Sequence, residues 1–383
     1  MSRDDLTPPD YAGGSLAAVL PAVARSLGAV RYAGVPDLGL APARRSVVVL
    51  VDGLGDEQLR QRAGHAPFLR RQLGESLTLD SGFPSTTATS MGSFGTGTPP
   101  GQHGMLGYEV LDPETDRVFN ELSWDGGPQP RRWQPLPTVF EALGPEGVEV
   151  TRVGPGFFDG SGLTEAALRG GRFVAAQSLE QRVEAALRAV AAAPRALVYL
   201  YWGDIDKVGH VHGCDSRQWG DELESVDRVL ADLARRVPAD TSVHVTADHG
   251  MVDVPVSHRV DLAREPALLD GVRHVGGEPR AVQLYCSGGA EAAAAVRDRW
   301  QERLGDAAYL LLRSELVEAG WVGPVRPEVL PRIGDVVALM RGQHSVVDST
   351  RMRSELLALR AMHGSVSSAE RSIPLVTVPA ERA

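Results

Sequence analysis

The sequence predicts an α/β fold, with a mostly parallel central sheet flanked by helices on both faces and a small α+β cap insertion. Two observations predict it. Short β-rich segments that end in turns alternate with helical patterns up to about residue 256 of the 383. Beyond that point the alternation stops, and strand and helix patterns follow one another in a different order. The chain is long enough for one large core with such an elaboration.

Four segments have the short, apolar, β-branched character of strands that are buried on both faces of a parallel sheet. They are Ser46–Val51, Gly147–Val153, Ala196–Trp202 and Thr241–Ala247. Ser178–Ala193 and Trp219–Val237 lie between them and carry apolar residues at helical spacing. Because strands that alternate with helices form parallel sheets, helices are expected on both faces.

The later part of the chain predicts a cap subdomain over residues 258–340, and residues 1–257 and 341–383 are expected to form the core. Within the cap, strands are predicted at Arg280–Cys286 and Gly334–Met340. A helix is predicted at Glu291–Leu304, and Tyr309–Ala319 mixes apolar and charged residues. This order of elements is typical of an α+β unit.

Composition narrows the classes of function. The formal net charge of −10 argues against binding to nucleic-acid polymers or acidic membranes, although bound cations would still permit phosphate substrates. The two cysteines, Cys214 and Cys286, have no CxxC context and predict neither a disulfide nor a thiolate metal site. With no signal pattern and no apolar run of membrane-spanning length, the chain is expected to be soluble and cytoplasmic.

Acidic and histidine side chains follow three of the four predicted strands. The first strand is followed by Asp52, the third by Asp204, Asp206 and His210, and the fourth by Asp248 and His249. Because the carboxyl ends of parallel strands meet at one edge of a sheet, these side chains are expected to converge there. The alternative is that the aspartates only cap helices and that His249 is an ordinary surface or core residue.

The spacing of these residues is suitable for metal binding. Asp206 and His210 are four residues apart and share one face if the segment is helical. A carboxylate with an imidazole is a ligand set that suits zinc and also manganese or iron. Asp248 and His249 are adjacent, so they can bind the same ion only if the backbone bends sharply, which Gly250 would permit.

A candidate nucleophile lies in the segment Phe83–Ser90, with the sequence FPSTTATS. Pro84 favours an extended entry, and Ser85 or Thr86 is expected to cap a helix of small residues over Ala88–Ser93. A hydroxyl at this position is near backbone amides that favour an anion. Threonine needs a metal to lower the pKa of its hydroxyl, so the nucleophile hypothesis depends on the metal site. An ordinary capped helix is the alternative.

The motifs VVVLVDG, FPSTTATS, DKVGHVHG and TADHGMVDV, in this order and spacing, resemble the alkaline phosphatase superfamily. The likeness is to its nucleotide pyrophosphatase/phosphodiesterase branch. It covers roughly Arg45–Asp253 and a short piece around His363. The resemblance implies a central parallel sheet with a smaller cap, and the late α+β unit is expected to be that cap, packed over the cleft and influencing substrate choice.

The resemblance also implies two divalent metal ions, with zinc expected and manganese or iron as alternatives. One ion would be held by Asp52, Thr87, Asp248 and His249, and the other by Asp206, His210 and His363. His344 is the alternative for the last ligand. Alignment on Pro84-Ser85-Thr86-Thr87 makes Thr87 the nucleophile.

The implied activity is hydrolysis of a small-molecule phosphate ester, with a phosphodiester or a nucleotide pyrophosphate bond broken through a phosphoryl- or nucleotidyl-threonine intermediate. The position three residues after Thr87, where the resemblance implies a contact to a phosphoryl oxygen, is Ser90. Further candidates for substrate contacts are His103, Tyr108 and Asn120. The alternatives are a phosphomonoesterase, a phosphonate hydrolase or a phosphomutase on the same scaffold, and a non-catalytic metal- or phosphate-binding module.

Overall fold

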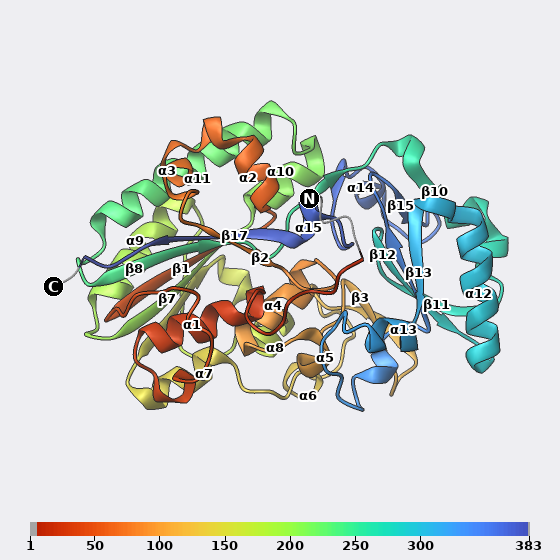
Figure 1. Cartoon of the computed structure of the whole chain (residues 1–383), viewed down its shortest axis with the longest axis horizontal. Helices are drawn as coiled ribbons and strands as arrows, with labels where there is room; N and C mark the ends of the chain where they lie inside the picture. The colour runs from red at the N-terminus through yellow and green to blue at the C-terminus, as the bar shows by residue number, and fades with distance from the viewer. Residues whose placement is uncertain (1–5, 382–383) are drawn as a thin grey trace.

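The computed structural model describes residues 6–381 and contains two large β-sheets that lie next to each other (Figure 1). The larger sheet has seven strands in the order β2-β17-β8-β1-β7-β5-β6. Their bounds are Leu77–Asp80, Ser372–Val378, Thr241–Thr246, Arg45–Val51, Ala196–Trp202, Glu149–Gly154 and Arg172–Ala175. Every neighbouring pair is parallel except the two that involve β17. The predicted α/β fold with a mostly parallel sheet is confirmed.

The four strands predicted from the sequence are β8, β1, β7 and β5, and they form the centre of this sheet. Their apolar side chains are almost all buried, as their uninterrupted apolar sequences require. Strand β17 is not among the predicted strands. It runs antiparallel to β2 and β8 because the chain returns to the central sheet from the far side of the molecule.

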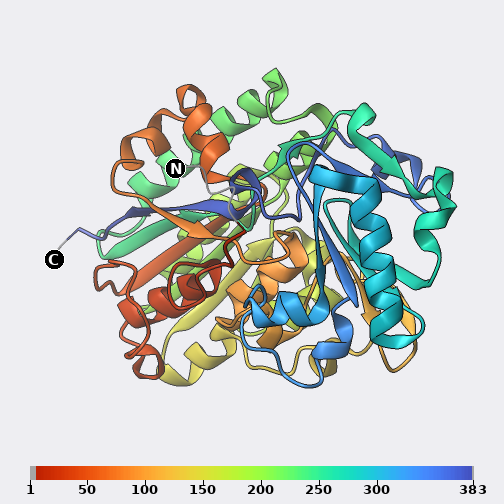
Figure 2. The same ribbon diagram turned by 45° about the vertical axis from the view of Figure 1, so that its right-hand side comes forward.

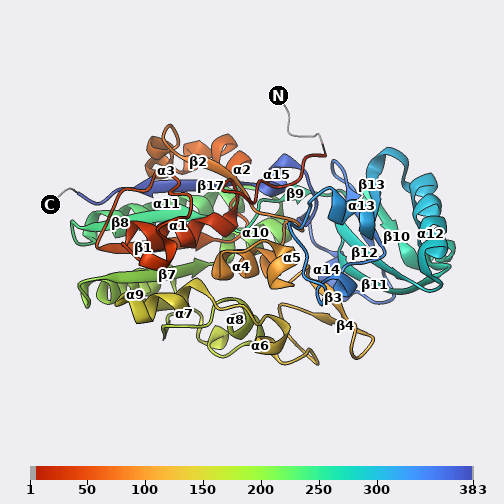
Figure 3. The ribbon, with the colours of Figure 1, turned by 60° about the horizontal axis from the view of Figure 1, so that its bottom comes forward.

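Helices cover both faces of the central sheet. On one face, α9 (Leu179–Ala191) and α11 (Arg217–Arg236) pack together, and Arg182 of α9 lies over Trp202. On the other face, α1 (Val19–Ser26) and α4 (Thr87–Thr96) pack in front of the sheet in Figure 3, and Phe94 of α4 contacts Tyr199. Tyr199 and Trp202 point to opposite faces because side chains alternate along a strand. Among the described helices, none combines the length and apolar character of a membrane span.

The second large sheet has six strands in the order β13-β14-β12-β11-β3-β4 and is antiparallel throughout. Their bounds are Ala308–Leu312, Val336–Met340, Ala281–Cys286, Val272–Glu278, Glu109–Asp112 and Arg117–Asn120. Helix α12 (Gly289–Leu304) lies across its outer face, as Figure 2 shows, and Trp300 lies in a small core of its own there. The β3-β4 hairpin lies outside residues 258–340, so this sheet extends beyond the predicted cap.

Candidate metal centre

The candidate ligands meet at the carboxyl edge of the central sheet. Asp52 directly follows β1, and Asp248 and His249 follow β8. Asp206 and His210 are in α10 (Asp204–His212), the helix that begins just after β7. His363 follows the short strand β16 (Ala361–Met362), which pairs with β9 (Val252–Asp253).

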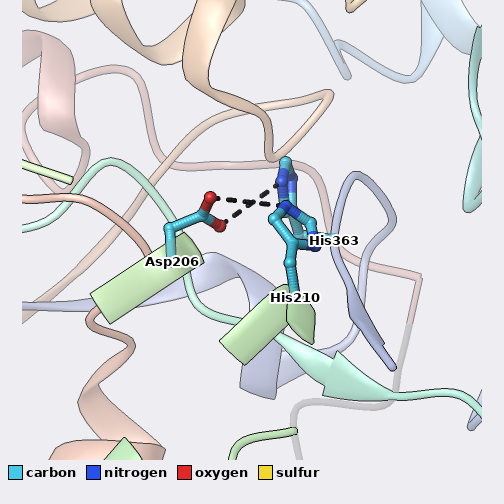
Figure 4. A group of neighbouring side chains, drawn as sticks. All are labelled: Asp206, His210 and His363. Carbon is cyan, nitrogen blue, oxygen red and sulfur yellow. Dashed lines mark ion pairs between the residues drawn. The ribbon is translucent and has the colours of Figure 1, made fainter. Parts of the chain in front are cut away.

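Asp206, His210 and His363 form one group (Figure 4). Nε2 of His210 is 3.3 Å from a carboxylate oxygen of Asp206, and Nε2 of His363 is 3.8 Å from the other oxygen. The ligand atoms of the three side chains all lie within 4.8 Å of one another. Asp204, the other acidic residue of this segment, is not in the group.

A second group surrounds Nε2 of His249. This nitrogen is 3.2 Å from Oγ1 of Thr87 and 3.5 Å from carboxylate oxygens of both Asp52 and Asp248. Asp206 joins the two groups, because its carboxylate also lies within 4.8 Å of the ligand atoms of Asp52 and His249. All seven sequence-predicted ligands therefore lie in one continuous cluster.

The three histidines orient their rings in the same way. Nδ1 of His210 donates to the carbonyl of Ala361 (2.8 Å), Nδ1 of His363 to that of Ser85 (3.1 Å), and Nδ1 of His249 to that of Gly250 (3.1 Å). A carbonyl oxygen only accepts, so Nδ1 carries the proton in each ring and Nε2 keeps its lone pair. This is the arrangement that metal-binding histidines adopt.

The carboxylates of the cluster are also suited to cations. Oδ1 of Asp52, Oδ2 of Asp248 and Oδ1 of Asp206 are buried and have no hydrogen-bond donor. Burial, followed by the charges of Asp248 and Asp206, raises the pKa of Asp52 well above its usual value. Divalent cations would offset this concentration of negative charge, and the oxygen and imidazole donors suit zinc, manganese or iron. The residues present therefore fit the pair of metal ions that the sequence implies.

Thr87 is the first residue of α4, and Thr86 is at the N-cap position. Thr86 is therefore the N-cap residue, as one of the two expected alternatives, but its side chain makes no capping bond, and Oγ of Ser85 donates to the carbonyl of Ser365. The side chain of Thr86 is buried beside the carboxylate of Glu278 and partly offsets the rise that burial causes in the pKa of this carboxyl. The amides of the first turn of α4 are consequently left open beside the hydroxyl of Thr87.

Two glycines in the turns after β1 and β8 allow other segments of the chain to pack closely against these turns. Gly53 has a φ of +74°, and a Cβ there would be 2.9 Å from Asp206. Gly250 has no left-handed conformation, and the backbone bends at Asp248. A Cβ at Gly250 would instead be 2.0 Å from the carbonyl oxygen of Ala369. Close backbone packing, rather than a sharp bend, requires glycine at this position.

Two of the four candidates for substrate contact point away from the cluster. Ser90 is fully buried and its hydroxyl donates to the carbonyl of Asp248. His103 is also buried, with Nδ1 accepting from the amide of Met105 and Nε2 next to Oγ of Ser93. Both residues therefore support the backbone around the cluster rather than the substrate.

Tyr108 and Asn120 line a cavity of ≈ 290 Å³ between the second sheet and the segment 346–356. Asp52, Thr87 and Asp206 line a different cavity of ≈ 240 Å³. Oδ1 of Asn120 accepts from the amides of Leu122 and Ser123, as in a turn. Neither Tyr108 nor Asn120 is among the residues that line the cavity at Thr87.

The cavity at Thr87 includes residues that sequence reasoning missed. Tyr201 donates a hydrogen bond from its hydroxyl to Oδ2 of Asp52, and Arg152, Phe158 and Phe173 form further walls. Tyr201 and Arg152 lie near the carboxyl ends of β7 and β5, so their strand position was the available signal. All the lining residues lie between residues 52 and 206. The segment 258–340 contributes none of these walls, and its influence on substrate choice stays a prediction.

The two candidates for the last histidine ligand lie in different places. Nε2 of His363 faces Asp206, and the ring is stacked on that of His249 with centroids 3.6 Å apart. His344 instead stacks on His258, with Nδ1 close to the carbonyl of Arg341. The geometry therefore favours His363 over His344.

Comparison with known structures finds proteins of similar fold. The murine ectonucleotide pyrophosphatase/phosphodiesterase 5 in complex with AMP is similar in structure, with 17% sequence identity, a TM-score of 0.69 and 87% of each chain covered. The human ectonucleotide pyrophosphatase/phosphodiesterase 5 has 15% identity and a TM-score of 0.70 over 88% of each chain. Phosphonoacetate hydrolase from Sinorhizobium meliloti 1021, in complex with phosphonoformate, has 21% identity and a TM-score of 0.67, covering 88% of this chain and 90% of that one.

These likenesses show a shared fold. The family itself follows from the sequence, because the model of type I phosphodiesterase / nucleotide pyrophosphatase matches residues 46–366. This match spans most of the chain and includes every residue of the two ligand groups. The chain therefore belongs to the type I phosphodiesterase / nucleotide pyrophosphatase family, a family of metal-dependent phosphoester hydrolases.

Proposed function

We propose that the protein hydrolyses phosphodiester or nucleotide pyrophosphate bonds through a covalent intermediate on Thr87, at a site that holds two divalent metal ions, with zinc as the expected metal. One observation carries the proposal. The hydroxyl of Thr87 lies at an open helix N-terminus and 3.2 Å from Nε2 of His249, within a cluster of carboxylates that have no donors.

The positions of the ligand atoms support a division into two sets. Asp206, His210 and His363 would hold one ion, and Asp52, Thr87, Asp248 and His249 the other. Such ions would lower the pKa of a bound hydroxyl or water and offset charge on the phosphoryl group. The bond between Tyr201 and Asp52 fixes the orientation of one carboxylate in this set.

The chain's own residues then act in two steps. Oγ1 of Thr87 loses its proton to solvent and forms a bond to phosphorus as the bond between phosphorus and the leaving oxygen breaks. A water molecule next attacks the same phosphorus and breaks its bond to Oγ1, which regenerates Thr87. In both steps the amides of the first turn of α4 can donate to a phosphoryl oxygen, so the protein mainly positions the substrate and stabilises charge.

Metal analysis combined with substrate comparison tests the proposal. We expect two equivalents of divalent metal per chain in purified protein, and faster hydrolysis of bis(4-nitrophenyl) phosphate than of 4-nitrophenyl phosphate. Chelation should abolish turnover, and zinc, manganese or iron added separately would identify the metal that restores it. A faster reaction with the monoester would indicate a phosphomonoesterase. A metal-loaded protein that cleaves no diester, monoester or phosphonate would contradict the proposal and indicate a binding module.

A further inference from the structure

One cationic residue, Arg152, lines the cavity at Thr87. Strand register places Phe173 of β6, Arg152 of β5 and Tyr199 of β7 side by side. All three line the cavity, so their side chains share the face of the sheet that α4 covers. Most other walls are apolar or aromatic; they include Leu122, Phe158, Leu163 and Leu168. Arg152 is the only lysine or arginine among the residues that line this cavity.

The guanidinium of Arg152 is buried without a hydrogen-bond acceptor. The residue is 7% exposed, and its Nε and Nη1 atoms have no partner. Its nearest aromatic contact is Phe173, whose ring centroid is 5.5 Å from the guanidinium carbon. A cation–π contact attracts the charge but satisfies none of the N–H groups.

The other buried arginines among the described residues have the hydrogen-bond acceptors that Arg152 lacks. Each of them donates to backbone carbonyls or to a carboxylate; they are Arg169, Arg182, Arg280, Arg332 and Arg371. Buried N–H groups in proteins are nearly always paired in this way, because an unpaired one costs the full free energy of desolvation. An arginine that lacks acceptors and lines a cavity next to a reactive hydroxyl is therefore suited to an acceptor on a ligand.

The surroundings of Arg152 indicate that the ligand's acceptor is negatively charged. Burial lowers the pKa of Arg152, and the charges of Asp159 and Glu165 oppose this shift. Neither carboxylate forms an ion pair with Arg152 among the described contacts. A guanidinium remains protonated even after a substantial lowering of its pKa. Its planar fork matches two oxygens of a carboxylate or of a phosphate, with charge-assisted bonds. A neutral carbonyl would satisfy fewer donors and leave the charge uncompensated.

We propose that Arg152 binds a second anionic group of the substrate, a carboxylate or a phosphate, while the scissile phosphoryl group lies at Thr87. This inference rests on the proposed function. Thr87 and Arg152 come from different elements, α4 and β5, and line the same cavity. Most of the other walls of this cavity are apolar or aromatic, so they suit an organic spacer between the two anionic groups. The enzyme would accordingly prefer phosphate esters that carry a further negative charge at the end of the ester group.

Symmetric aryl diesters test this preference, because they present the same group whichever way they bind. The matched pair is bis(4-carboxyphenyl) phosphate and its neutral isostere bis(4-carbamoylphenyl) phosphate, with bis(4-phosphonophenyl) phosphate as the third arm. The readout is the ratio of kcat/KM values for the charged and neutral diesters. Arg152→Met should lower this ratio at least about tenfold, the scale of one charge-assisted hydrogen bond, and Arg152→Lys should lower it less. The third arm identifies whether a carboxylate or a phosphate is preferred.

Arg172→Met is the matched control, because Arg172 is exposed on β6 and carries the same charge one residue before Phe173. A ratio that Arg152→Met leaves unchanged, or that both variants lower equally, would overturn the inference. If Arg152→Met does not fold, the wild-type ratio and Arg152→Lys decide. The dissociation constants of 4-carboxyphenyl phosphate and 4-carbamoylphenyl phosphate, measured by calorimetry on metal-loaded protein, need no turnover. They keep this inference testable if the hydrolytic proposal fails.

Discussion

At the scale of single residues, the histidines of the two ligand groups differ from the buried His103 in the nitrogen that they leave available. His210, His249 and His363 all donate from Nδ1 to a backbone carbonyl, and Nε2 faces the cluster. In His103, by contrast, Nδ1 accepts from a backbone amide and Nε2 is next to Ser93. The backbone partner of Nδ1 therefore separates a ring that is ready to bind a cation from one that supports the fold.

Thr87→Ala should abolish turnover while the fold and most of the bound metal remain. Its hydroxyl is the only candidate ligand that also forms a covalent bond, and each ion would keep three other ligands. Steady-state rates on an aryl phosphodiester, with metal content measured on the same samples, check this expectation.

Thr86→Ala is the internal control for this variant, because it removes the same atoms one residue away. Its side chain is buried beside the carboxylate of Glu278, so we expect turnover to persist with a loss of stability of about 1–3 kcal/mol. An inactive Thr86→Ala beside an active Thr87→Ala would show that the nucleophile is Thr86. Activity in both variants would indicate that water attacks directly.

His103 should make the protein less stable in acid. Burial lowers its pKa from 6.5 to about 3, so between these values the unfolded chain binds a proton that the folded chain excludes. Stability therefore falls as the pH falls through this range, by about 1.4 kcal/mol per pH unit. We expect His103→Gln to be less stable than wild type at pH 7 and the difference to shrink by roughly 2 kcal/mol at pH 5. Urea unfolding at both pH values measures this, and an unchanged difference would contradict the assignment.

At the scale of secondary structure elements, the metal cluster depends on how closely the turns after β1 and β8 approach each other. Gly55 and Gly250 meet with their backbones in contact, and the amide of Gly250 donates to the carbonyl of Glu370 at 2.7 Å. The turn that carries Asp248 and His249 is therefore held between the first turn of the sheet and the short helix α15 (Ser368–Arg371).

Gly250→Ala should displace this turn. The new Cβ would be 2.0 Å from the carbonyl oxygen of Ala369 and 2.9 Å from Cα of Gly55, and both are backbone atoms that cannot rotate away. We expect a loss of about 1–3 kcal/mol of stability, as for other overpacked sites, together with weaker metal binding. Gly64→Ala is the matched control, because a Cβ there has no neighbour within 4 Å. Thermal unfolding and metal content distinguish the two variants, and equal behaviour would contradict the packing argument.

At the scale of the whole molecule, the two large sheets are joined by a buried ion pair. Nε and Nη2 of Arg280, at the turn between β11 and β12, bond to both carboxylate oxygens of Glu370 at 2.7 and 2.8 Å, and both side chains are fully buried. Oε1 of Glu370 also accepts from the amide of Ser365, two residues after His363. The pair therefore connects the second sheet to the segment that supplies the last candidate ligand.

Glu370→Gln should weaken this connection strongly. It leaves the guanidinium of Arg280 buried without a negative partner, and breaking one side of a buried pair typically costs about 3–5 kcal/mol. Replacing both partners by apolar residues, in Arg280→Met with Glu370→Leu, should recover part of that loss, because no charge is then left uncompensated. Denaturant unfolding of the single and double variants measures both effects. A single variant as stable as wild type would show that the pair is not needed to hold the sheets together.

Most of the central sheet could be predicted because its strands are local features of the chain. The segments Ser46–Val51 and Ala196–Trp202 are apolar and β-branched over their whole length, and both form strands within a residue of the predicted bounds. Strand β17 was not predicted, since only its neighbours β2 and β8 determine its direction. The extent of the second sheet was also missed, because the β3-β4 hairpin joins it from a distant part of the sequence.

The sequence by itself determined the fold class, the family and the seven residues that meet at the carboxyl edge of the sheet. It could do so because the period of apolar residues and the positions after strand ends depend on neighbours along the chain. Only the tertiary structure decided which hydrogen-bond partners the other polar side chains have. It showed Ser90 and His103 bonded to the backbone or to buried neighbours, and it showed Arg152 without an acceptor in the floor of the cavity. Those outcomes depend on strand register and close packing between distant segments, which no local pattern encodes.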